Sequence, residues 1–422
     1  MNSKEAIEYI NSVSWEGKKP GLSRTCELLK LMANPEKKLK FIHIAGTNGK
    51  GSTAAMTAEI LIKAGYKTGL STSPSIFKFN ERMKVNGEEI SDNELAEIVE
   101  YIKPLAESMI SGPTEMELIT CTALEFFKRK KCDIVVLETG MGGELDSTNV
   151  IETPEVAVIT NIGLDHTKFL GNSISEITKT KCGIIKENGT VVLYRGTSET
   201  EKIAEKICKE KNSKLIKADF NTIELLEHSI DGQIFNCGNR KNIFLSLLGN
   251  HQLKNASVVL SIIDILIEKG YKISEDNIRQ GFKEVKWPGR FEIIGHNPLF
   301  IIDGGHNPQC INALSENIET YLPNQKLTIL TGVLADKDYE KMYLPIIPYA
   351  KEFVCIEPPS PRKLSAFKLA EKLAKKGAKS SAYNKISDGV KAAINNAGKD
   401  GIVLCFGSLY MIADVKNTLK NQ

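Results

Sequence analysis

Short apolar runs rich in Ile and Val alternate with amphipathic stretches of about helix length along most of this 422-residue chain. Such alternation is typical of a parallel sheet covered by helices on both faces, so we predict the α/β fold class with a mostly parallel sheet. Five strands are expected in the first two-thirds of the chain: Phe41–Ala45, Thr68–Thr72, Asp133–Glu138, Val156–Asn161 and Thr190–Leu193. The clearest helices there are Ser52–Ala64, Met116–Lys130, Glu199–Lys211 and Gln252–Lys269.

The pattern restarts after Trp287-Pro288-Gly289-Arg290, which indicates a second, smaller α/β domain with a boundary near residues 291–298. Length alone allows two or three domains at roughly 150 residues each. The expected strands of the second domain are Phe300–Asp303, Leu327–Gly332, Phe353–Ile356 and Ile402–Phe406. Its expected helices are Pro308–Tyr321, Ser365–Lys376 and Val390–Asn396.

The composition excludes several classes of protein. With 41% hydrophobic and 25% charged residues, the chain is neither disordered, collagenous nor a coiled coil. A formal net charge of +3 is too small to indicate a nucleic-acid surface. No apolar run approaches the ~20 residues of a membrane span, and the N-terminal residues lack the apolar core of a signal peptide. The nine cysteines occur singly, without zinc-site spacing, so we expect a cytoplasmic chain that binds neither nucleic acid nor membrane.

A glycine-rich loop connects the first expected strand to the first strong helix, and this is the context that a phosphate-binding loop requires. The loop reads Gly46-Thr47-Asn48-Gly49-Lys50-Gly51-Ser52-Thr53. Its glycines let backbone N–H groups point at phosphate oxygens, Lys50 can reach a β- or γ-phosphate, and the hydroxyl of Ser52 or Thr53 can hold Mg²⁺. The spacing departs from G-x-x-x-x-G-K-[ST], and the alternative is a glycine-rich turn capped by Ser52.

Polar residues follow three further strands at their carboxyl ends, where open parallel sheets bind ligands. Ser73 follows Thr68–Thr72, Glu138 ends its strand, and Asp165-His166 comes after Val156–Gly163. Together these groups are suitable for Mg²⁺, which prefers oxygen ligands, although a histidine is unusual in that role. Each also has a structural interpretation: a turn before Pro74 for Ser73, a solvated strand end for Glu138 and a helix cap for His166.

Two other positions are less clear from the residues alone. Lys181 lies among other lysines, and local reasoning favours a solvated helix face. In the second domain, Asp303-Gly-Gly-His306-Asn307-Pro308 follows the strand that begins at Phe300, again at a carboxyl end. Asp303 and Asn307 can serve as cap and turn residues there, or Asp303 and His306 can contribute to a nucleotide site.

Many motifs in order along nearly the whole chain make it similar to the folylpolyglutamate synthase/dihydrofolate synthase family of the Mur ligase superfamily. The motifs that carry this resemblance are Leu39–Ser52, Ser73-Pro74, Phe79–Arg82, Gly142-Gly143, Leu145–Asn149, Leu164–Thr167, His251-Gln252, Asn255-Ala256, Pro288–Phe291, Asp303–Pro308 and Leu334–Asp338. The resemblance implies an N-terminal P-loop-type ATPase domain, residues 1–294, that binds ATP and folate. It also implies a C-terminal Rossmann-like glutamate-ligase domain, residues 295–422.

The resemblance also implies roles for individual residues. Catalytic roles fall to Lys50, Glu138, His166, Lys181, Asp303 and His306. ATP contacts fall to Gly46, Thr47, Asn48, Gly49, Lys50, Gly51, Ser52, Thr53, Asn255, Arg290 and Asp303. The implied magnesium ligands are Ser52, Ser73, Glu138, His166 and a carbamylated Lys181, which replaces the local interpretation of that lysine. The implied folate-binding residues are Thr114, Glu115, Met116, Glu117, Leu145, Asp146 and Ser147.

Two positions depart from the family pattern near the implied folate site. Glu144 stands where the family usually has arginine, and Met116 stands where an aromatic residue is common. Methionine is an adaptable apolar residue, so we expect these differences to affect substrate preference and to leave the ATP chemistry unchanged.

The resemblance predicts an ATP-dependent, ADP-forming ligase that adds L-glutamate to a folate carboxylate through an acyl phosphate. The expected cofactors are ATP and Mg²⁺, with a monovalent cation left open, and the expected state is a monomer. The acceptor can be tetrahydrofolate, dihydropteroate or both. Other hypotheses are a muramyl-peptide ligase, which needs a UDP-binding domain ahead of the first strand, a P-loop ATPase without ligase activity, and a non-catalytic binding protein.

Overall fold

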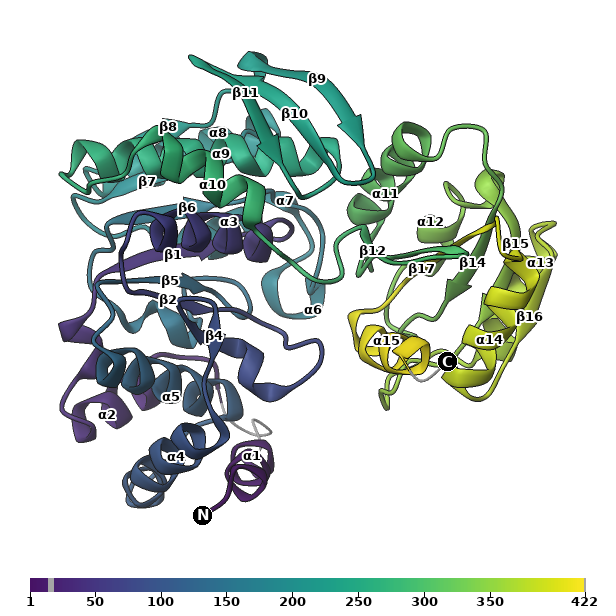
Figure 1. The fold of residues 1–422 in the computed structure, drawn as a ribbon. Helices are drawn as coiled ribbons and strands as arrows, with labels where there is room; N and C mark the ends of the chain where they lie inside the picture. The colour runs from purple at the N-terminus through teal and green to yellow at the C-terminus, as the bar shows by residue number, and fades with distance from the viewer. Residues whose placement is uncertain (14–18, 421–422) are drawn as a thin grey trace. The chain divides into compact units, whose positions relative to one another are not determined.

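The computed structural model describes residues 1–13 and 19–420, which divide into two compact units. Unit 1 comprises Met1–Glu224, Asn236–Phe244 and Lys254–Val285; unit 2 comprises Leu225–Phe235, Leu245–Leu253 and Lys286–Gln422. Figure 1 labels most helices and strands of both units. The last segment of unit 2 begins at Lys286, and two short earlier segments also belong to this unit; the functional domains 1–294 and 295–422 stay a prediction.

Unit 1 contains an eight-stranded sheet of order β4-β3-β2-β5-β1-β6-β7-β8. Neighbouring strands are parallel from β2 to β8, and β3 and β4 extend one edge in antiparallel pairing. Since β5 and β6 flank β1, groups at the carboxyl ends of these three strands share one edge of the sheet. The strands are β1 (Phe41–Ala45), β2 (Thr68–Ser71), β3 (Met83–Val85), β4 (Glu88–Glu89), β5 (Ile134–Glu138), β6 (Val156–Ile159), β7 (Thr190–Leu193) and β8 (Lys214–Lys217).

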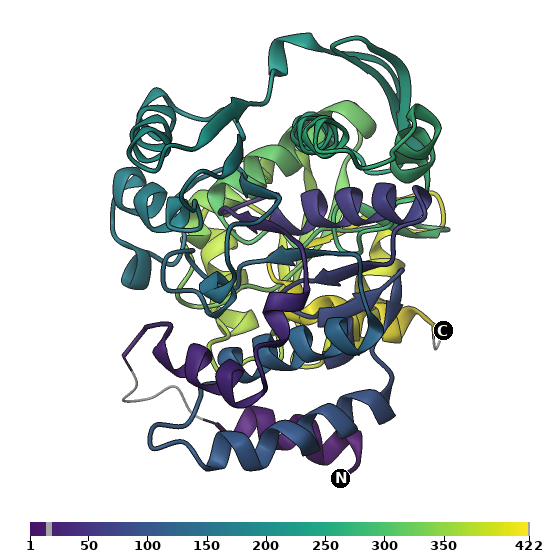
Figure 2. The same cartoon turned by 90° about the vertical axis from the view of Figure 1, so that its left-hand side faces the viewer.

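Helices cover both faces of this sheet. Figures 1 and 2 show α2, α4 and α5 on one face and α3 on the other, with α10 beside α3. These helices are α1 (Ser3–Ser12), α2 (Ser23–Leu31), α3 (Lys50–Lys63), α4 (Asp92–Glu107), α5 (Glu115–Lys130), α6 (Thr167–Leu170), α7 (Ile174–Cys182), α8 (Ser198–Glu210), α9 (Asn250–Glu268) and α10 (Glu275–Glu284). The first residues of α9 belong to unit 2 and the rest to unit 1.

Burial on both faces explains why the central strands have continuous apolar sequences. Every residue of β1 and β5 is buried, as expected for parallel strands between two helical layers. Val135 and Leu137 of β5 pack in the same core as Phe127 of α5 and Leu28 of α2. Burying a side chain of this size contributes about 1.5–3 kcal/mol, so this core is a main source of stability for unit 1.

Unit 2 is built on a six-stranded sheet of order β12-β13-β17-β14-β15-β16, parallel except for the antiparallel edge pair β12–β13. Its core includes Ile301, Ile329, Phe353 and Phe406 from four of the strands. The strands are β12 (Glu292–His296), β13 (Leu299–Ile302), β14 (Leu327–Thr331), β15 (Ala350–Cys355), β16 (Ser380–Ala382) and β17 (Ile402–Phe406). The helices are α11 (Pro308–Tyr321), α12 (Tyr339–Tyr343), α13 (Ala366–Lys375), α14 (Ile386–Ala397) and α15 (Ile412–Lys420).

A separate three-stranded sheet, of order β11-β10-β9, comes from segments that alternate between the units. Its strands are β9 (Ile223–Ser229), β10 (Gly232–Cys237) and β11 (Arg240–Leu245). The sequence did not predict it, because none of the residues of β9 is fully buried and the strand lacks a clear apolar face.

The strands and helices that the sequence predicted are all present, with ends shifted by four residues or fewer. The predicted α/β class and mostly parallel sheet are therefore confirmed. The sequence did not predict helices α1, α2, α4, α6, α7, α10, α12 and α15 or, in the two large sheets, strands β3, β4, β8, β12 and β16. Within the described ranges, no helix combines the length and apolar character that crossing a bilayer would require.

A histidine in the middle of β1 makes the stability of unit 1 sensitive to acid. His43 is fully buried, with Nε2 2.8 Å from Thr148 Oγ1. Burial, with a smaller effect from the positive charge of Lys186, lowers the pKa of His43 from 6.5 to about 3. Between pH 6.5 and about 3, His43 of the unfolded chain binds a proton that His43 of the folded chain does not. The neutral, buried histidine is therefore fully compatible with folding above pH 6.5, and the free energy of unfolding decreases as the pH falls below that value.

We predict that His43→Asn weakens the dependence of stability on pH between pH 6.5 and about 4. The free energy of unfolding of the wild type should fall with pH by about 1.4 kcal/mol per unit more steeply than that of the variant. Urea denaturation at several pH values measures both slopes. Equal slopes in the two proteins would show that His43 is protonated in the folded state.

Candidate active site

The glycine-rich loop connects β1 to α3 as predicted, and two of its glycines are required by geometry. Gly49 precedes α3 with φ +86°, a left-handed conformation that side chains other than glycine rarely adopt. A Cβ on Gly46 would lie 1.8 Å from Thr160 Oγ1, so this position has no room for a side chain. The close packing brings the loop backbone onto the segment after β6.

Hydrogen bonds fix this loop against the residues that follow β6. The backbone N–H groups of Thr47 and Asn48 donate to the Asn161 carbonyl at 2.9 and 3.1 Å. Thr47 Oγ1 donates to the Gly163 carbonyl at 3.0 Å and accepts from Gly163 N at 3.1 Å. The N–H groups of Thr47 and Asn48 are thus already hydrogen-bonded to the protein in this structure. Lys50 is the first residue of α3.

Three of the predicted site residues lie together at the carboxyl ends of β1, β2 and β5. Lys50 Nζ is 3.8 Å from Glu138 Oε1, and the Ser73 N–H donates to Glu138 Oε2 at 3.1 Å. Glu138 is buried, whereas Lys50 and Ser73 are partly exposed. A lysine and a carboxylate beside a phosphate loop can hold a nucleotide and its metal ion, which favours the functional interpretation of Glu138 over a solvated strand end.

Lys181 lies beside the same loop, and the local interpretation as a solvated helix face is wrong. Its side chain is 4% exposed, and Nζ donates to the Gly46 carbonyl at 2.7 Å. Burial, and then the positive charge of Lys50, lower the pKa of Lys181 to about 7 against the opposite effect of Asp165 and Asp146. A substantial fraction of this amine is therefore neutral near physiological pH, which lysines at the surface are not.

The second glycine loop, Gly140–Gly143, packs closely against α7, the helix that carries Lys181. A Cβ on Gly143 would lie 2.7 Å from the Lys181 carbonyl oxygen, and the Glu144 N–H donates to the Thr180 carbonyl at 2.8 Å. Asp146 then closes the loop, because its carboxylate accepts from Met141 N at 2.8 Å and from Thr148 N at 3.0 Å. Burial raises the pKa of Asp146, and these hydrogen bonds oppose that shift.

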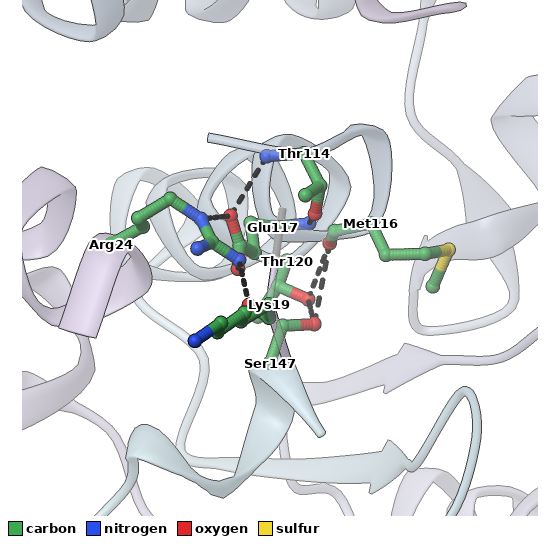
Figure 3. Close-up of polar contacts among 7 residues, drawn as sticks. All are labelled: Lys19, Arg24, Thr114, Met116, Glu117, Thr120 and Ser147. Carbon is green, nitrogen blue, oxygen red and sulfur yellow. Dashed lines mark hydrogen bonds and ion pairs between the residues drawn. The ribbon is translucent and has the colours of Figure 1, made fainter. Parts of the chain in front are cut away.

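The first turn of α5 contacts this loop through the predicted folate-binding residues (Figure 3). Thr120 Oγ1 is 2.6 Å from Ser147 Oγ, and the two hydroxyl oxygens lie 2.9 and 3.3 Å from the Met116 carbonyl oxygen, so the three groups share the two hydroxyl hydrogens. Thr114 caps the helix in a capping box with Glu117. Thr114, Met116, Glu117, Asp146 and Ser147 are thus brought into one connected group, and Glu115 and Leu145 adjoin it in the chain.

Asn255 and His166 belong to other elements of unit 1. Asn255, in α9, is buried against the phosphate loop, since a Cβ on Gly49 would lie 2.6 Å from its Oδ1. His166 is exposed, has φ +50° and directly precedes α6, so its backbone occupies the cap position that the alternative interpretation assigned to it. Ser52 and Thr53 are both buried in the first turn of α3.

Unit 2 places the remaining predicted residues around the turn after β13. Asp303 is buried and accepts from Phe291 N at 2.9 Å and from Gly305 N at 2.7 Å. Arg290 lies against this turn, because a Cβ on Gly304 would be 2.5 Å from its guanidinium. His306 Nδ1 is 2.9 Å from the Gly304 carbonyl. Asp303 therefore stabilises the turn through these two hydrogen bonds, as its structural interpretation predicted. Its role as an ATP ligand stays a prediction.

The metal-binding prediction involves donors of several chemical types. Within residues 1–13 and 19–420, no group of three His, Cys, Asp or Glu side chains forms a metal-binding cluster. The predicted set contains only two residues of those types, Glu138 and His166, and takes its other donors from hydroxyls and a modified lysine. Hydroxyl and carboxylate oxygens suit Mg²⁺, which commonly keeps several waters and few protein ligands.

Comparisons with known proteins identify the family. The Mur ligase middle domain family matches residues 44–263, and the Mur ligase glutamate ligase domain matches residues 289–409. The chain is 35% identical to the dihydrofolate synthase/folylpolyglutamate synthase of Bacillus subtilis, over 99% of both chains. It is 32% identical to the folylpolyglutamate synthase of Lacticaseibacillus casei, again over 99% of both.

Solved structures agree with these sequence matches. The structure of apo L. casei FPGS superposes with a TM-score of 0.88 at 30% identity, covering 100% of both chains. E. coli FolC in complex with DHPP and ADP gives a TM-score of 0.88 at 27% identity, covering 100% of this chain and 98% of that one. The predicted family and the predicted enzyme class, an ADP-forming ligase, are thereby confirmed. The chain belongs to the folylpolyglutamate synthase/dihydrofolate synthase family of Mur ligases.

Proposed function

We propose that this enzyme joins L-glutamate to the carboxylate of a pteroate-type acceptor, either dihydropteroate or a tetrahydrofolate, at the expense of ATP. The observation that carries the proposal is the arrangement of Lys50, Glu138 and Lys181 around the phosphate loop, next to the connected group of Met116 and Ser147. Support also comes from the relatives' names and from the FolC structure with DHPP and ADP. We further propose that it acts as a monomer, and that it works in the reducing environment of the cytoplasm, which its nine free cysteines suit.

The chemistry follows from the poor reactivity of a carboxylate toward amines. An acceptor carboxylate oxygen attacks the γ-phosphorus of ATP, the bond to the bridging oxygen breaks, and ADP leaves. The glutamate amine then attacks the acyl carbon, the carbon–oxygen bond to phosphate breaks, and an amide, inorganic phosphate and a proton are released. Lys50 is suited to stabilise the charge that spreads over the transferred phosphoryl group.

The residues fit Mg²⁺, with Ser52, Ser73, Glu138, His166 and a carbamylated Lys181 proposed to hold it. Bound there, Mg²⁺ would neutralise negative charge on the ATP phosphates. Carbamylation adds CO₂ to a neutral amine, and burial favours the neutral form of Lys181. The modification would replace a cation by an anion, which is more favourable beside a divalent cation.

The proposal is tested by measuring phosphate release with ATP and L-glutamate in the presence of dihydropteroate or tetrahydrofolate. We expect phosphate release only when an acceptor and glutamate are both present, and the two acceptor rates define the preference. Phosphate release that needs neither substrate would favour the alternative, a P-loop ATPase without ligase activity. An acceptor-dependent rate with no amide product would also contradict the proposal.

A further inference from the structure

A largely buried ion pair joins α2 to the first turn of α5. Arg24, in the first turn of α2, contacts Glu117 through two hydrogen bonds: Nε to Oε2 at 3.0 Å and Nη2 to Oε1 at 2.7 Å (Figure 3). The Arg24 and Glu117 side chains are only 12% and 6% exposed. Two-point contact between guanidinium and carboxylate fixes orientation as well as distance, which a single ammonium group cannot do.

Glu117 is the residue that joins this ion pair to the helix cap. Its Oε2 also accepts from the Thr114 N–H at 2.7 Å, and the Glu117 N–H donates to Thr114 Oγ1 at 3.4 Å. Arg24 Nη2 also donates to the Lys19 carbonyl at 3.2 Å. The position of the α5 N-terminus therefore depends on a side chain from α2 that the sequence did not single out.

The same turn of α5 continues to the glycine loop. The Met116 carbonyl accepts from Ser147 Oγ, and a Cβ on Gly140 would lie 3.0 Å from Met116 Cε. Met116, Met141 and Leu145 have large exposed fractions, 37%, 42% and 51%, although all are apolar. We name these three residues the acceptor surface, because exposed apolar side chains from the first turn of α5 and the adjoining glycine loop suit a flat ring system.

We infer that Arg24 is a positioning residue for the pteroate-type acceptor: through Glu117 it holds the first turn of α5 and thereby the acceptor surface. The inference rests on the proposed function and adds to it a residue of α2 that acts on the acceptor surface through Glu117. Without Arg24, the Glu117 carboxylate is left buried without its cationic partner. The α5 turn then shifts or loosens, and acceptor binding weakens while the ATP site keeps its geometry.

The test compares steady-state kinetics of the wild type with Arg24→Gln and Arg24→Lys, varying the acceptor and ATP separately. We expect the KM for the acceptor to rise about tenfold in Arg24→Gln, with the KM for ATP nearly unchanged. Arg24→Lys keeps the charge and loses the two-point contact, so it should give a smaller rise. If Arg24→Gln is unfolded at the assay temperature, the inference is tested by Arg24→Lys, whose KM for the acceptor should rise while its KM for ATP stays unchanged.

Arg240→Gln is the matched control. Arg240 also forms a partly buried double ion pair in unit 1, with Asp264 at 2.6 Å and Glu275 at 2.8 Å, but on β11, α9 and α10. It should leave both KM values unchanged even if it lowers the unfolding temperature. An unchanged acceptor KM in folded Arg24 variants, or equal rises in both KM values, would overturn the inference alone. A wild type that uses neither acceptor would overturn the proposed function as well.

Discussion

Lys50→Ala should lower kcat by about three orders of magnitude or more while the protein stays folded. Lys50 is the first residue of α3, partly exposed, with Nζ 3.8 Å from Glu138 Oε1. Its removal takes away the cation best placed to stabilise the transferred phosphoryl group. Since the side chain is not part of an apolar core, stability should change little. Single-turnover formation of ADP, with circular dichroism as the folding check, measures the effect.

Lys63→Ala provides the control on the same helix. Lys63 forms ion pairs with Glu284 at 2.6 Å and Glu59 at 3.3 Å, near the last turn of α3. Exposed pairs of this kind contribute little, so activity should stay within about twofold of the wild type. A Lys50→Ala enzyme as active as Lys63→Ala would refute the role of the loop lysine.

Lys181→Ala should abolish ligase activity, and short carboxylates such as acetate should restore part of it. The expected loss follows from the proposed carbamate, an anionic group beside the phosphate loop where the structure buries the lysine side chain. Acetate is smaller than the side-chain atoms that the substitution removes, and it supplies carboxylate oxygens for Mg²⁺. The measurement is the ligase rate against acetate concentration, together with intact mass of the wild type prepared with and without bicarbonate.

Lys179→Ala is the control for this experiment, because Lys179 lies on the same helix and is exposed. It should be fully active and insensitive to acetate. Full activity of Lys181→Ala would remove this residue from the site. Loss of activity with no rescue, and a wild-type mass that never includes the added CO₂, would show that Lys181 acts as an unmodified amine.

The central strands and the phosphate loop could be predicted because their signals are local. β1 and β5 are buried on both faces, so their sequences are continuous apolar runs, and the glycines of the loop mark a backbone that side chains would block. The grouping of Ser73 and Glu138 also followed from a general rule, since parallel strands end at one edge of the sheet.

Other features depend on contacts between distant segments and carry no local signal. Lys181 looked like one of several solvated lysines, and its burial comes from packing of α7 against two glycine loops. The Arg24–Glu117 ion pair joins residues 93 positions apart, so nothing in the sequence around Arg24 indicates it. The strands β9–β11 were missed because exposed β9 has no regular apolar alternation. In each case the structure of the segment is determined by tertiary contacts and not by its local sequence.

The central claim is that ATP activates the acceptor carboxylate as an acyl phosphate. The most direct test uses an acceptor whose carboxylate oxygens are ¹⁸O and follows the label by mass spectrometry of the released phosphate. If the carboxylate attacks the γ-phosphorus and the amine later displaces phosphate, an oxygen from the acceptor carboxylate is carried into the inorganic phosphate in each turnover. Phosphate without label, formed at the same rate as the amide, would contradict the account.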